Sequence, residues 1–281
     1  MSDWRTALRN ALGHRSFAVG AGLTLLLVLV ALVSLVWTPY AAVEIDMTGR
    51  LIPPSGEHWF GQDHLGRDVM SLAMVGAQNS IMVGVIAVGV GVSAGAALGA
   101  LAAAEGGWID ELVMRLSDLT FAFPALLSAI MLTAVLGPGI AISIVSIGIF
   151  NIPIFARITR ASAIAIWARD YTTAARAAGK GRFRITIDHV LPNILSPLTV
   201  QATIQFANAI LYEATLSYLG LGTQPPHPSW GRMLNDAQAQ LFQAPWLAVF
   251  PGVAIMLAVL GLNLLGDGLQ DILDPRMARS R

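Results

Sequence analysis

The sequence has no cysteine, and only 12% of its 281 residues are charged. The missing cysteines exclude a disulfide framework, a thiolate metal site and a cysteine nucleophile. The low charge excludes a typical soluble globular protein, in which about 25% of residues are charged. The formal net charge is zero, so bulk charge predicts no nucleic-acid partner. Apolar residues dominate instead, at 55% of the chain with a mean hydropathy of +0.65.

Signatures of catalysis are also missing. No G-x-x-x-x-G-K-[ST] phosphate loop occurs, because Gly179-Lys180-Gly181 lacks the upstream glycine and the following hydroxyl. No Ser-His-Asp arrangement or metal-ligand pair stands out, and His58 and His64 are interpreted as solvated loop histidines. The sequence therefore predicts a non-catalytic chain that binds neither a metal nor another cofactor.

Apolar runs predict an all-α, polytopic membrane protein with six transmembrane helices, each long enough for a bilayer core of about 30 Å. The first run exceeds the roughly 7 to 15 residues of a signal-peptide core and has no convincing cleavage site, so we predict an uncleaved anchor. A polar turn is expected from Glu105 to Asp118. The six spans are predicted at about 17–37, 81–103, 119–136, 140–158, 194–216 and 246–265.

Composition divides the chain into two parts. Residues 1–78 join an anchor helix to a polar, proline-containing and glycine-containing extracytoplasmic segment. Residues 79–281 form a five-helix core interrupted by a polar loop at 159–193.

Lysine and arginine are distributed very unevenly between the two sides of such a bundle. With both termini in the cytoplasm, every lysine and arginine except Arg50, Arg67 and Arg232 falls on the cytoplasmic side. Cytoplasmic loops of membrane proteins carry this excess. The pattern predicts cytoplasmic termini and a cytoplasmic 159–193 loop.

Small residues recur every four positions in the second span, at Ala87, Gly91, Gly95, Gly99 and Ala103. Such a stripe lets a neighbouring helix backbone approach closely. We therefore predict close helix packing along this face.

Polar side chains line one face of the fifth span, where Gln201, Gln205, Asn208 and Tyr212 are spaced by four, three and four. Two interpretations are open. The stripe lines a translocation path, because polar groups that face lipid are costly, or it supplies hydrogen bonds between helices. Asn151 in the fourth span is a further path-lining prediction, beside a proline kink.

The polar and basic island from Asp170 to Pro192 predicts a short, two-turn helix. Asp170 is suited to capping its start, Ala174 and Ala175 favour helix, and Gly179 suits the left-handed position after its end. An ordinary amphipathic loop helix is the alternative to a docking element.

This island resembles the EAA loop of binding-protein-dependent ABC transporter permeases, through Ala174-Ala175, Gly179 and the stretch 187–192. In that family the loop forms the coupling helix that docks on the ATPase subunit. Thr173 stands where the family frequently has glutamate. The resemblance implies coupling roles for Asp170, Thr173, Ala174, Ala175, Gly179 and Arg182.

Three more stretches resemble the peptide and nickel branch of these permeases: HWFGQDHLGRDVMSLAMVGAQNS, EATLSYLGLGTQPPHPSWGRML and NLLGDGLQDILDPR. The first matches a GTDxxGRDxxSR signature, although Leu72 replaces its usual arginine. The second predicts an outer loop suited to meeting a binding protein, with Glu213, Pro225 and Trp230 as contact residues. Glu213 either orients this loop or touches substrate.

The resemblance implies a permease subunit of an ATP-driven importer that moves di- or oligopeptides across the bacterial inner membrane. Its implied partners are a homologous second permease, two ATPase subunits that hold ATP and Mg, and an extracytoplasmic solute-binding protein. Nickel or another small solute is the alternative cargo. A stand-alone secondary transporter or channel is the alternative from another class, against which the chain shows no membrane-buried acidic relay and no detectable inverted repeat.

Overall fold

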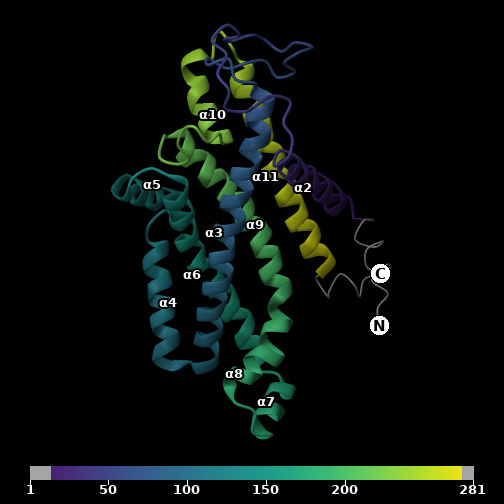
Figure 1. Ribbon diagram of the computed structural model, residues 1–281. Coiled ribbons are helices and arrows are strands. Elements are labelled where there is room, and N and C mark those ends of the chain that lie inside the picture. Colours follow the sequence, from purple (N-terminus) through teal and green to yellow (C-terminus); the bar gives the residue numbers. More distant parts are fainter. Residues whose placement is uncertain (1–13, 274–281) are drawn as a thin grey trace.

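The computed structural model describes residues 14–273, which form an elongated helical bundle without a named strand (Figure 1). The predicted all-α class is confirmed over these residues. The elements are α2 (Arg15–Val33), α3 (Val69–Glu105), α4 (Gly107–Phe121), α5 (Ala125–Leu136), α6 (Ile140–Trp167), α7 (Asp170–Ala177), α8 (Arg182–Ile185), the π-helix η1 (Thr186–Val190), α9 (Leu191–Tyr218), α10 (Trp230–Ala237), the 3-10 helix η2 (Gln238–Gln240) and α11 (Trp246–Leu273).

Within the described residues, five helical stretches are long and apolar enough to span a membrane, or six if α4 and α5 together make one span. These two helices meet at an angle of 82° beside Pro124, the proline that interrupts the predicted span at 119–136. The predicted turn at 105–118 is wrong, because residues 107–121 form α4. Its acidic residues pair with α6, Asp110 with Arg160 and Asp118 with Arg157.

The helix α3 is much longer than predicted and starts twelve positions earlier, at Val69 rather than residue 81. Asp68 caps it by accepting a hydrogen bond from the Ser71 amide at 2.8 Å. The polar side chains of its first turns find partners, as when Gln78 donates to Ser34 Oγ at 2.7 Å. Satisfied polar groups therefore extend the helix beyond its apolar run.

The small-residue stripe of α3 packs against α6, as predicted. A Cβ added at Gly95 would lie 2.5 Å from the Ile152 carbonyl oxygen, and one at Gly99 would lie 2.2 Å from the Ala156 oxygen. Both distances are below van der Waals contact, so only glycine permits this approach. The stripe makes α3 and α6 a closely packed pair.

The anchor helix α2 packs against α11 by the same device. An added Cβ at Gly20 would meet the Leu265 amide nitrogen at 2.2 Å, and one at Gly268 would meet Phe17 Cα at 2.6 Å. The helix α9 lies between α11 on one side and α3 and α6 on the other. It therefore joins the two packed pairs into one bundle.

Different elements lie at the two ends of the molecule. Figure 1 shows α7 and α8 at one end, together with the turn between α3 and α4. The segment 38–68 and α10 lie at the opposite end. The predicted cytoplasmic residues 1–13 and 274–281 lie outside the described residues.

Candidate docking, passage and outer-loop sites

The helix α7 begins and ends close to its predicted limits, but Asp170 does not cap it. Arg169 occupies the capping position, and Asp170 is the first helical residue. Two threonines follow in the first turn, and the high helix propensity of the alanines and arginine after them favours helix. The Asp170 carboxylate in the first turn is favourable to the helix dipole.

Gly179 ends α7 in a Schellman motif. Its amide donates to the Arg176 carbonyl at 3.0 Å, and the Lys180 amide donates to the Ala175 carbonyl at 3.1 Å. Gly179 has a φ of +87°, a left-handed conformation that favours glycine. A Cβ added there would meet no atom within 4 Å, so backbone conformation alone selects this residue.

A residue that the sequence analysis missed, Thr172, fastens α7 to the end of α6. Its hydroxyl is within hydrogen-bonding distance of the carbonyls of Arg169 at 2.6 Å and Trp167 at 2.9 Å. Thr172 is buried, whereas Asp170, Thr173 and Ala174 are exposed. The exposed side of α7 therefore carries small and polar groups, together with the ring of Tyr171, on a fixed helix.

Arg182 begins α8 and pairs with Glu105, the last residue of α3. Glu105 begins the predicted turn at 105–118, and Arg182 lies in the predicted loop at 159–193. The contact therefore joins two segments whose paired residues are 77 positions apart in sequence. Arg182 and Asp170 are the charged members of the predicted coupling set, and within the described residues Arg182 forms an ion pair, with Glu105.

The predicted path residues of α9 differ in burial. Gln201, Asn208 and Tyr212 are half-buried, and Gln205 is 7% exposed. Asn151 belongs to another setting, because it packs where α3 crosses α6. A Cβ added at Gly91 would lie 2.4 Å from Asn151 Cβ.

Glu213 is fully buried near the end of α9 and accepts hydrogen bonds from three hydroxyl groups. Ser217 donates to Oε1 at 2.7 Å and Thr223 donates to the same atom at 3.2 Å. Ser80 of α3 donates to Oε2 at 3.3 Å. The carboxylate therefore ties the loop after α9 to both α9 and α3, and because it is fully buried it presents no surface to an outer protein in this structure.

The rest of the outer loop divides into exposed and buried parts. Pro225 is exposed, as a contact surface requires. Trp230 is only 2% exposed, and its indole donates to the Ala73 carbonyl at 2.9 Å. Trp230 thus anchors α10 to α3 and presents no surface to an outer protein in this structure.

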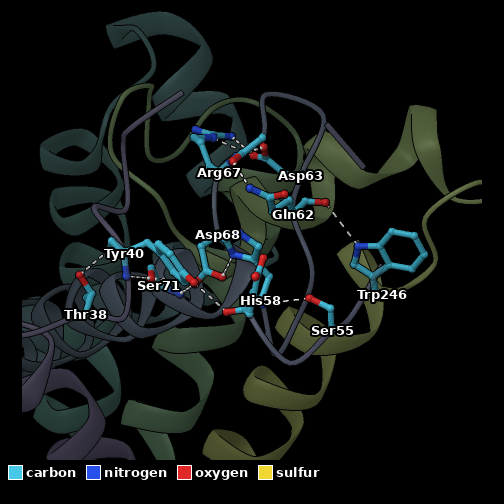
Figure 2. Close-up of polar contacts among 12 residues, drawn as sticks. Thr38, Tyr40, Ser55, His58, Gln62, Asp63, Arg67, Asp68, Ser71 and Trp246 are labelled. Carbon is cyan, nitrogen blue, oxygen red and sulfur yellow. Dashed lines mark hydrogen bonds and ion pairs between the residues drawn. The ribbon is translucent and has the colours of Figure 1, made fainter. Parts of the chain in front are cut away.

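The first signature stretch folds into a polar clasp at the same end (Figure 2). Asp63 accepts from the Leu65 amide at 2.8 Å and from the Arg67 guanidinium at 2.7 Å. Arg67 also lies 3.7 Å from Asp236 of α10. The clasp therefore fixes the segment before α3 against the outer loop.

The loop histidines are not solvated as predicted. His58 Nδ1 lies 3.0 Å from Asp68 Oδ1, and the His58 ring contacts Tyr40 at a centroid distance of 4.4 Å (Figure 2). His64 Nδ1 is buried. Residues 14–273 hold no group of three potential metal ligands. His58 instead helps Asp68 to hold the start of α3.

Known transport proteins are similar to this chain in sequence over most of its length. The chain is 42% identical to the dipeptide transport system permease protein DppC of Alkalihalophilus pseudofirmus, over 99% of this chain and 91% of that protein. It is 45% identical to the glutathione transport system permease protein GsiD of Escherichia coli, over 94% of this chain and 88% of that protein. The GsiD protein of Salmonella typhimurium is also 45% identical, over 98% and 91%.

A solved structure of the MetNI methionine ABC transporter in an inward-facing conformation has a similar fold. The TM-score is 0.60 at 18% identity, covering 73% of this chain and 98% of the other. Residues 95–279 match the family described as "Binding-protein-dependent transport system inner membrane component". The helical membrane architecture and these matches show that the chain belongs to this family of transport permeases.

Proposed function

We propose that this chain is a non-catalytic permease subunit of an ATP-driven importer that moves di- or oligopeptides across the bacterial inner membrane. The observation that carries the proposal is α7, a short helix with a glycine stop and an exposed face of small and polar residues. A separate ATPase subunit docks on this face, through Asp170, Thr173 and Ala174. Thr173 supplies a hydroxyl where the family's glutamate would supply a charge.

The proposed assembly contains this chain, a homologous permease, two ATPase subunits with ATP and Mg, and an external solute-binding protein. Closure of the ATPases moves α7 and the helices attached to it. A ligand-driven change of this kind requires the docking helix to bind differently in the two states. The division into 1–78 and 79–281 is retained as part of the proposal, and the family match at 95–279 lies inside the second part.

The proposed path follows the polar face of α9, from Gln201 through Gln205 and Asn208 to Tyr212. Polar groups at membrane depth are costly unless they face a bundle interior or water. Asn151 is left out of the lining on this proposal, because its Cβ packs against Gly91 of α3. The outer loop at Pro225 meets the binding protein.

A double variant, Gln205→Leu with Asn208→Leu, tests the path. Transport is expected to be abolished while the subunits still assemble, because leucine fills the face without removing a helix. Thr199→Leu, an exposed change on the same helix, is the matched control. Undiminished transport in the double variant would refute the proposed path.

Peptide cargo is supported by the names of two relatives, a dipeptide permease and a glutathione permease. Uptake of a labelled dipeptide, with nickel as competitor, is measured in cells that lack the chain and in cells resupplied with it. Restored peptide uptake that requires an intact ATPase is the expected result. Loss of nickel accumulation alone would move the cargo to metal, and transport without any copurifying ATPase would favour a stand-alone transporter.

A further inference from the structure

The docking region, residues 170–190, is connected to the rest of the bundle at α6, α9 and α3. It continues covalently into α6 before Asp170 and into α9 through η1. Its link to α3 is different, because Arg182 with Glu105 is the one ion pair between residues 170–190 and α3 in the described chain. α3 is also linked to the docking region indirectly, through its packing on α6, so the pair is the direct ionic link between the end of α3 and α8.

An apolar groove lies between α3 and the part of the docking region that begins at α8. The cavity holds about 610 Å³ and runs between α3, α8, η1 and the start of α9. The α3 wall consists mainly of small residues, including Ala97 and Ala100, and the facing wall includes Phe183 and Ile187. Glu105 and Arg182 line the groove where α3 ends, so their pair bridges an otherwise open gap.

Both charges occupy helix positions that their own helices disfavour. Glu105 is the last residue of α3, where the helix dipole opposes a carboxylate. Arg182 is the first residue of α8, where the dipole opposes a cation. Pairing offsets both disadvantages, so local helix stability does not account for the choice of either residue.

The helix that this pair holds moves as part of a larger unit. The glycine stripe packs α3 tightly against α6, and α6 is paired with α4 through Asp110 and Asp118. A displacement of α3 is therefore expected to move α6 and α4 with it. The groove leaves room for α3 and α8 to separate if the pair is absent.

From these observations, and building on the proposed docking of an ATPase at α7, we propose that Arg182 is a positioning residue that acts through Glu105. The pair is a strap that holds the end of α3 directly to α8 during the ATP cycle, so that the groove between them does not open. Arg182 thus couples the ATPase to the bundle from inside this chain, and it is not a docking contact.

The test uses the complete transporter with spin labels on Ala97→Cys and Ile187→Cys, which face each other across the groove. The natural chain has no cysteine, so within this chain labelling is confined to these two positions, and the transporter labelled without the two cysteines supplies the background spectrum. With the pair intact, dipolar broadening in the EPR spectrum is expected to stay constant when ATP is added. In Arg182→Glu and in Glu105→Arg, ATP is expected to reduce the broadening.

Transport gives a second readout of the same variants. Because both side chains are partly exposed, labelled dipeptide moved per ATP hydrolysed should fall about two- to five-fold in either single variant. The double exchange, Arg182→Glu with Glu105→Arg, should restore both readouts. The matched control exchanges Glu111 and Arg115, an exposed pair within α4, and should change neither.

Three results would overturn the strap: broadening that changes with ATP in the native pair, single variants that behave as the native chain, or ATPase binding lost in Arg182→Glu and not restored by Glu105→Arg. The last result would make Arg182 a direct docking residue. Failure of the native chain to copurify with any ATPase is separate, because it would refute the proposed function itself.

Discussion

At the scale of single residues, Gly179 is selected by backbone conformation alone. Gly179→Val should weaken ATPase docking, because a β-branched residue at a φ of +87° costs at least about 1–2 kcal/mol and removes the stop of α7. Copurification of the ATPase with the permease measures the effect. Because no neighbour is displaced, the loss of stability on unfolding should be limited to this backbone strain.

The matched control for this substitution is Gly181→Val. Gly181 also has open space around its Cα, but its φ of −69° is accessible to any residue. Gly179→Asn should behave nearly as the native chain, because asparagine tolerates the left-handed region. Equal docking by Gly179→Val and Gly181→Val would contradict this account of α7.

Glu213 is the second residue with a sharp expectation. Glu213→Leu removes the acceptor of three buried hydroxyl groups, and each unpaired buried group costs about 1–3 kcal/mol. Transport activity and the unfolding temperature in detergent should both fall, whereas Glu213→Gln should retain part of each. Glu57→Leu, at an exposed position of the outer segment, is the control. A stable and active Glu213→Leu protein would show that the loop does not depend on this carboxylate.

Predictions for single residues succeed where the local backbone conformation favours one residue type. Gly179 was predictable because the residue after a helix end commonly adopts a left-handed backbone conformation, which favours glycine. Thr172 was not, because its acceptors are carbonyls that become free only where α6 ends. Trp230 was assigned to a contact surface because it lies in the signature stretch of the predicted outer loop, but α10 turns it toward α3.

At the scale of helices, the approach of α3 to α6 depends on missing side chains. Gly99→Ala should destabilise the protein by about 1–3 kcal/mol, because the added methyl would lie 2.2 Å from the Ala156 oxygen. Gly89→Ala on the same helix meets no atom within 4 Å and should be neutral or slightly stabilising. Unfolding in detergent compares the two variants, and equal stability would contradict the close packing.

Helix prediction failed where polarity was taken as a sign of irregular chain. The segment 107–121 has charged residues, so apolar length alone could not identify α4 as a helix. Its carboxylates point to arginines of α6 that lie 39 and 50 positions later in the sequence. Such long-range partners are invisible to a local pattern, whereas the apolar runs of α6, α9 and α11 are not.

At the scale of the whole molecule, the uneven distribution of lysine and arginine predicts which end faces the cytoplasm. Cysteines placed at Ala178 and His227, both exposed and at opposite ends, test this orientation with a membrane-impermeant maleimide. His227→Cys should react in spheroplasts, and Ala178→Cys only after permeabilisation. The native chain is the blank, because it has no cysteine. The reverse labelling pattern would invert the proposed topology.

The π-helical turn at 186–190 sets a rotational phase between the docking region and the polar face of α9. A π turn holds one more residue than an α turn, and one residue of α-helix corresponds to about 100° of rotation. Because five residues of a π turn rotate the chain about as far as four residues of α-helix, this turn absorbs its extra residue with little change of phase, whereas inserting one more residue would turn α8 by roughly 100° relative to Gln205. The direction in which a displacement of the docking region reaches the proposed path along α9 is thus set by the number of residues in this turn, which no side-chain substitution alters.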